Sequence, residues 1–171
     1  MDAAVGVSSA LTVRGGFKGW EEAADERSEG AVSTVDGVNR SVCLNLNNSA
    51  AVTVERMRFY RAKGHGLNKT GAGDITLVDC RFERTLNTGE YSGRGLYAAG
   101  TAGTTLFAAT GCEFVDNETL SGSVSRAGGT GIGAYVGNFA RATFDDCLFA
   151  GNGDVNRVGG WTYAQNKVSG L

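Results

Sequence analysis

A single histidine and four cysteines are the side chains of this sequence best suited to acid–base, nucleophilic or metal chemistry. His65 lies between two glycines, and no serine or cysteine stands beside it in the sequence for it to activate. The cysteines are isolated from one another and form no Cys-x-x-Cys pair, which zinc sites usually contain. We therefore predict no catalytic residue, no metal site and no cofactor among these side chains.

Three of the cysteines mark an internal repeat. The repeated phrase is apolar-x-apolar-x-x-Cys-x-Phe, with methionine replacing cysteine in the first copy, and it occupies 52–59, 75–82, 107–114 and 142–149. A second phrase, Gly-x-Gly followed by an apolar residue, occurs at 64–67, 93–96 and 131–134. Met57, Cys80, Cys112 and Cys147 are separated by 23, 32 and 35 residues. The phrases keep their length while the intervening segments vary, as in a solenoid with loop insertions.

Within the first phrase, apolar residues alternate with other residues at a period of two, which is typical of a strand with one buried face. Short strands separated by glycine and asparagine predict an all-β fold, a right-handed parallel β-helix of about five to six coils with variable loop insertions. We expect residues 1–171 to form one domain that is a segment of a longer protein. A polar loop is predicted at 17–30, and a frayed or capping C-terminal coil at 153–171.

Equivalent residues of successive coils should stack in columns inside such a fold. The cysteines Cys80, Cys112 and Cys147 would form one inward column below Met57. We predict buried free thiols there, because parallel side chains in one column suit a disulfide poorly. A second inward column would hold Phe59, Phe82, Phe114 and Phe149. Asn117 and Asn152 are predicted to form a structural asparagine ladder.

The residue after each Gly-x-Gly-apolar phrase should face outward. Those residues are Asn68, Tyr97 and Tyr135, with Tyr163 as a weaker extension of the column. Exposed tyrosines in a row could stack on sugar rings or contact a partner protein. These four residues are therefore the candidate binding residues. The alternative is that an insertion loop folds over them.

Carboxylates that cleave a glycosidic bond must gather on one outward face. Here two outward columns change sign or lose their charge along the chain: Arg56, Asp79, Gly111 and Asp146, and Arg58, Arg81, Glu113 and Leu148. We interpret them as a solvated face whose surface ion pairs contribute ~0–1 kcal/mol each.

Composition excludes several classes of protein. The net charge of −2 argues against a nucleic-acid partner bound by bulk positive charge. No apolar run reaches the ~18 residues of a membrane-spanning helix, so we expect no membrane insertion of this segment. Residues 1–12 also lack the basic start and apolar run of a signal peptide.

The pattern Cys-x-Phe-x-x-Asn at 112–117 and 147–152, alternating with Gly-x-Gly, resembles the repeats of polymorphic outer membrane proteins. More broadly, it is similar to right-handed parallel β-helix repeat proteins of the pectate-lyase-like superfamily. The resemblance covers roughly residues 11–152. It implies a surface-exposed, often adhesive part of a secreted protein, located outside the cell or on its surface.

The sequence therefore predicts a non-catalytic stalk or adhesive segment whose partner is a carbohydrate or the surface of a partner protein. One alternative is a carbohydrate-active enzyme, a polysaccharide lyase or hydrolase, or a sugar-binding module, with the tyrosine column as its sugar platform. Another is a self-assembling structural unit, because exposed end coils favour end-to-end association.

Overall fold

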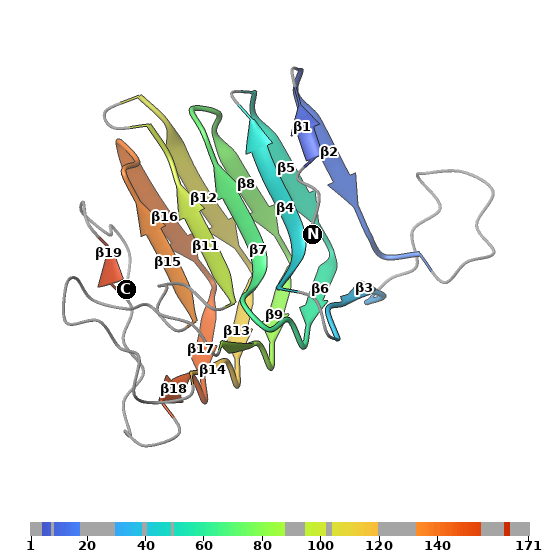
Figure 1. The fold of residues 1–171 in the computed structure, drawn as a ribbon. Helices are drawn as coiled ribbons and strands as arrows, with labels where there is room; N and C mark the ends of the chain where they lie inside the picture. The colour runs from blue at the N-terminus through green and yellow to red at the C-terminus, as the bar shows by residue number, and fades with distance from the viewer. Residues whose placement is uncertain are drawn as a thin grey trace.

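The computed structural model describes residues 5–7, 9–17, 30–38, 41–48, 50–87, 95–101, 104–119, 133–154 and 163–164. Most of the predicted polar loop and of the predicted C-terminal coil lies outside these residues. The described part contains short strands and no helix (Figure 1). The strands are β1 (Val5–Val7), β2 (Leu11–Arg14), β3 (Ser33–Asp36), β4 (Val42–Asn48), β5 (Val52–Glu55), β6 (Met57–Tyr60), β7 (His65–Thr70), β8 (Ile75–Val78), β9 (Arg81–Glu83), β10 (Leu86–Asn87), β11 (Leu96–Ala99), β12 (Leu106–Thr110), β13 (Glu113–Val115), β14 (Glu118–Thr119), β15 (Ala134–Gly137), β16 (Arg141–Asp145), β17 (Leu148–Ala150), β18 (Gly153–Asp154) and β19 (Tyr163–Ala164).

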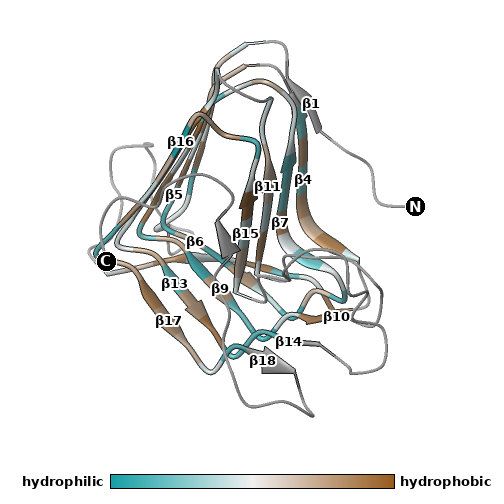
Figure 2. Cartoon of the chain, turned by 90° about the vertical axis from the view of Figure 1, so that its left-hand side faces the viewer, coloured by the Kyte–Doolittle hydropathy of each residue, from teal (hydrophilic) through white to brown (hydrophobic). Residues whose placement is uncertain are grey.

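The strands stack in parallel into four sheets. Sheet A has the order β1-β4-β7-β11-β15-β19, sheet B β16-β12-β8-β5-β2, sheet C β17-β13-β9-β6-β3 and sheet D β10-β14-β18. Along the chain, a strand of sheet B is followed by one of sheet C, in later repeats by one of sheet D, and then by one of sheet A. Figure 2 shows sheets A, B and C on three sides of a common interior. The all-β prediction is confirmed, and the stacking is compatible with a parallel β-helix.

The repeat alignment made from the sequence is the register of sheet B. Val52 pairs with Ile75, Ile75 with Phe107, and Phe107 with Ala142. The predicted inward residues are buried in β5, β8 and β12, as is Ala142 in β16. Phe144 is only half-buried, because β16 is the last strand of its sheet. Period-two alternation therefore identified the buried face of each strand.

The predicted phenylalanine column packs ring on ring through sheet C. Ring centroids are 5.1 Å apart between Phe59 and Phe82, 4.9 Å between Phe82 and Phe114, and 4.6 Å between Phe114 and Phe149. The planes are nearly parallel, with interplanar angles of 18°, 3° and 8°. The spacing matches the distance between hydrogen-bonded strands, so the strand ladder sets the ring stack.

The predicted asparagine ladder is buried beside these rings. Asn117 Nδ2 donates to the Phe82 carbonyl oxygen at 3.0 Å and to Asn152 Oδ1 at 2.8 Å. Asn152 Nδ2 repeats the pattern on the Phe114 carbonyl oxygen at 2.7 Å. Each amide therefore satisfies buried backbone groups at a corner where no strand pairing is available.

The second glycine of the Gly-x-Gly phrase is required because the backbone of the next repeat approaches it closely. A Cβ on Gly95 would lie 2.5 Å from the Gly133 carbonyl oxygen and 3.0 Å from Phe82 Cβ. A Cβ on Gly66 would meet the Gly95 carbonyl oxygen at 2.6 Å. Any larger residue would push sheet A away from the phenylalanine column, so this glycine is a packing requirement of the repeat.

Two corners of the fold place residues in the left-handed backbone region. One corner joins sheets B and C and includes Arg56 and Asp79, with φ of 51° and 52°. The other follows sheet C and includes Arg61, Arg84 and Asp116, with φ of 57°, 53° and 52°. Arg56 and Asp79 were expected to belong to an outward column on a strand. They lie instead at a corner between two strands, and there they form an ion pair at 4.0 Å.

The cysteine column is present and unbridged. Cys80 and Cys112 are buried, whereas Cys147, expected to be buried, is half-buried because it lies in the last strand layer of sheets B and C. Each of these thiols donates to the carbonyl oxygen two residues earlier, at 3.3 or 3.4 Å. Cys43 is a fourth free thiol, half-buried in sheet A.

We expect the four thiols to react with Ellman's reagent only after unfolding. Burial raises the pKa of Cys43 to about 11, and the hydrogen bond with Cys112 raises the pKa of Cys147. Both half-buried thiols are therefore protonated at neutral pH, and the thiolate is the reacting form. The measurement is thiol release with and without guanidinium chloride. Fast reaction of any cysteine in the folded chain would contradict this arrangement.

Candidate binding surface

The four candidate binding residues fall in one register column of sheet A. Asn68 in β7 pairs with Tyr97 in β11, Tyr97 pairs with Tyr135 in β15, and Tyr135 pairs with Tyr163 in β19. The side chains of the first three are half-buried, while the Tyr163 side chain lies outside the described part. Asn45 in β4 extends the column by one strand, and Asn68 Nδ2 donates to its Oδ1 at 2.9 Å.

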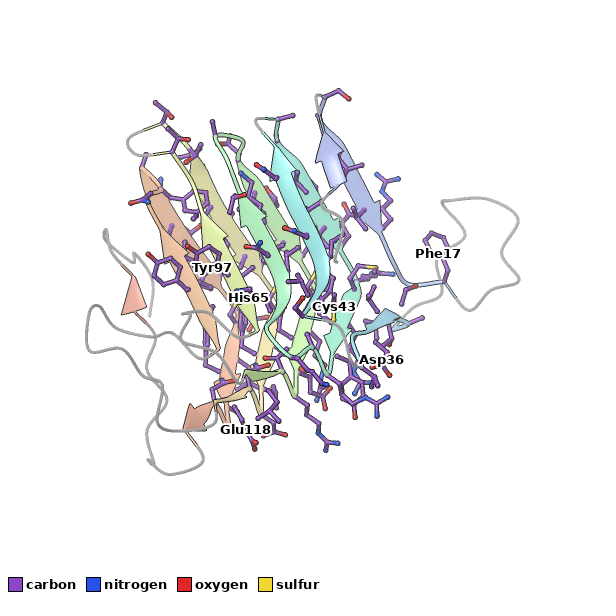
Figure 3. All side chains as sticks on the ribbon, in the orientation of Figure 1. Phe17, Asp36, Cys43, His65, Tyr97 and Glu118 are labelled. Atoms are coloured by element: carbon purple, nitrogen blue, oxygen red, sulfur yellow. The ribbon has the colours of Figure 1, made fainter. Side chains whose placement is uncertain are left out.

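The aromatic rings of this face stack on one another. Tyr97 and Tyr135 have ring centroids 4.9 Å apart with an interplanar angle of 9°. His65, on the neighbouring strand, lies 5.2 Å from Tyr97 at 36° (Figure 3). The two faces of the Tyr97 ring are therefore covered by Tyr135 and His65. A spacing of 4.9 Å leaves no room for a sugar ring between the tyrosines.

Gly137 allows the Tyr135 ring to lie along its own strand. A Cβ on Gly137 would lie 2.6 Å from the Tyr135 hydroxyl oxygen and 2.9 Å from its ring carbons. The ring thus leans over the glycine two residues later, with its hydroxyl group against that glycine. Burial raises the pKa of Tyr97, so that hydroxyl remains a hydrogen-bond donor through the physiological pH range.

Sequence reasoning missed two members of this surface. Asn45 precedes the first Gly-x-Gly phrase, so the phrase could not locate it, although a Leu-Asn pair occurs at both 44–45 and 67–68. The sequence showed His65 only as a histidine between two glycines with no nucleophile beside it. Its position between the two glycines of the phrase places it against the tyrosine of the next repeat.

No protein family, curated protein or solved structure matches this chain.

The outer face of sheet C carries a charged cluster centred on Glu83. Its Oε2 accepts from Arg58 Nη2 at 2.7 Å and from Arg81 Nε at 2.9 Å. Burial opposes the charged form of Glu83, but the hydrogen bond from Arg58 and the charge of Arg81 outweigh it and lower the pKa. Glu113 pairs with Arg81 Nη1 at 2.8 Å. The lowered pKa of Glu83 disfavours a role for it as general acid.

Within the part of the chain that the structure describes, no group of three or more His, Cys, Asp or Glu side chains is arranged to hold a metal ion. None of the described elements is a helix long and apolar enough to cross a membrane.

Proposed function

We propose that this chain is a right-handed parallel β-helix of the pectate-lyase-like kind that acts as a non-catalytic, adhesive segment of a secreted or cell-surface protein. The parallel order of the sheets and the in-register repeats support the β-helix. The repeat phrases support the extracellular location through their resemblance to surface proteins.

The observation that carries the adhesive role is the column Asn45, Asn68, Tyr97 and Tyr135 on one face of sheet A. It repeats amide and phenol groups at the strand spacing of about 4.8 Å. Half-exposed tyrosine side chains suit an interface that combines apolar contact with hydrogen bonds. Since Tyr135 and His65 already cover both faces of the Tyr97 ring, a partner protein fits this surface better than a sugar ring that would stack on Tyr97.

Replacing Tyr97 and Tyr135 together by alanine should weaken adhesion about tenfold or more, because tyrosines often dominate interface energetics. Stability should fall by roughly 1–3 kcal/mol, because two half-buried rings and their stacking are lost, and circular dichroism would verify that the variant is folded. Beads coated with the chain would be tested on collagen-coated, albumin-coated and cellulose surfaces. The matched control replaces Thr53 and Thr76, an outward register pair of sheet B, by alanine.

Three results bear on this proposal. Loss of binding to a protein surface in the tyrosine variant alone supports it. Tyrosine-dependent binding to cellulose alone would replace the protein partner with a carbohydrate. Release of unsaturated product from polygalacturonate or alginate, with or without calcium, would contradict a non-catalytic role.

A further inference from the structure

A second surface feature lies at the corner between sheets C and D. It is an open groove of about 710 Å³. Its walls include Tyr60, Ala62 and Thr85, together with the exposed apolar side chains of Val38 and Leu86. In Figure 3, Glu118 marks this region at the bottom of the molecule, away from Tyr97 on sheet A. The groove is thus separate from the tyrosine column.

The charge along this groove changes sign from one repeat to the next. The exposed positions two and four residues after each column phenylalanine are Arg61 and Lys63, then Arg84 and Leu86, then Asp116 and Glu118. Leu86 and Glu118 are register partners, and the Leu86 amide donates to the Ala62 carbonyl oxygen at 2.9 Å. Adjacent strands are about 4.8 Å apart, so the cationic and anionic ends are about 10 Å apart.

Some of the charged side chains along the groove already have partners within the chain, and others do not. Arg61 forms an ion pair with Asp36, and Arg84 Nη1 donates to the Tyr60 hydroxyl at 3.4 Å. Lys63, Asp116 and Glu118 form no ion pair with any residue that the structure describes. One cation and two carboxylates therefore remain at opposite ends, with Leu86, 37% exposed, between them.

We propose that this groove is a self-association face through which two copies of the chain pair side by side about a two-fold axis near Leu86. The column four residues after each phenylalanine, Lys63, Leu86 and Glu118, runs positive, apolar, negative and is complementary to itself after a rotation of 180°. Arg84, at the level of Leu86, already forms an ion pair with Glu83 at 3.7 Å. Lys63 of each copy then faces the carboxylates of Asp116 and Glu118 in the other, while the two Leu86 side chains meet at the centre. An isologous interface requires this self-complementarity, and an apolar centre with a charged rim is the usual arrangement.

This association differs from end-to-end stacking of exposed strands. It uses outward side chains of the middle repeats and no unpaired strand edge. It also leaves the tyrosine column of sheet A free for the proposed partner. Because the interface depends on exposed charges, added salt should weaken it.

The test is sedimentation equilibrium of the full chain with paired charge reversals. We expect wild type to dimerise reversibly, and Lys63→Glu and Glu118→Lys each to weaken dimerisation about tenfold or more, since each change creates two symmetry-related repulsions. An equimolar mixture of the two variants should recover a heterodimer. The double variant Lys63→Glu/Glu118→Lys should recover part of the homodimer, because the contacts between positions 63 and 118 are again opposite in charge while Asp116 is unchanged.

The matched control is Arg141→Glu, an exposed charge reversal on sheet B that should leave dimerisation unchanged. Circular dichroism would verify that each variant is folded, and the rescue by mixing distinguishes a lost contact from a lost fold. A wild-type chain that stays monomeric up to its solubility limit would overturn the proposal. So would a dimer that is insensitive to both single reversals, or single-variant defects that neither the mixture nor the double variant repairs.

Discussion

Replacing Asn117 by alanine is expected to destabilise the chain by roughly 3–5 kcal/mol, because several buried partners at ~1–3 kcal/mol each would lose their hydrogen bonds. Asn117 Oδ1 accepts from the Thr85 amide at 3.2 Å and from Thr85 Oγ1 at 2.8 Å. Its Nδ2 donates to the Phe82 carbonyl oxygen and to Asn152 Oδ1. No water can replace these contacts easily, since Asn117 is completely buried. Urea unfolding would measure the loss.

Two variants identify the cause of that loss. Asn68→Ala removes an asparagine from the outward face of sheet A and should change the free energy of unfolding by about 1 kcal/mol or less. Asn117→Asp keeps the size but replaces the amide donor with an acceptor. Burial should raise the pKa of the new carboxyl above ~3.9 in the folded chain. Its stability is therefore highest at low pH and falls as pH rises through that raised pKa. A stable Asn117→Ala variant would mean that the ladder contributes little.

The inward columns could be predicted because a strand has a side-chain period of two. Once Cys80, Cys112 and their phenylalanines were aligned, register, burial and ring stacking followed from that period and the strand spacing. The tyrosine column was found in the same way, since Tyr97 and Tyr135 hold the same position in two repeats.

The corners and the contacts between different phrases could not be predicted in this way. Arg56 and Arg61 adopt a left-handed backbone that arginine rarely favours, so their residue type gave no signal. His65 is the middle residue of one Gly-x-Gly phrase, whereas Tyr97 follows the apolar residue of the next phrase. Aligning the repeats therefore does not place these two side chains together, although they are in contact. The sequence does contain a pattern from which the groove could have been predicted. The residues two and four positions after each column phenylalanine change from basic to acidic along the chain.

Replacing Phe114 by alanine is expected to cost about 3–5 kcal/mol, the usual range for a core aromatic ring. Phe114 is fully buried and stacks between Phe82 and Phe149 in the inner column of sheet C. Phe144 adds an edge contact at 6.1 Å. The cavity would open between two rings held by their own strands, so little collapse can offset it. Chemical denaturation at equilibrium would measure the loss.

The position of the ring in the stack allows a sharper test. Phe149 continues the same column but is only half-buried, so Phe149→Ala should cost clearly less than Phe114→Ala. Contacts in stacked repeats are mainly between neighbours, so the damage should stay local. Hydrogen exchange in Phe114→Ala should quicken in β9, β13 and β17 while β2 and β5 keep their protection. Equal losses in the two variants, or a Phe114→Ala change within about half a kcal/mol, would show that the column does not support the fold as its geometry requires.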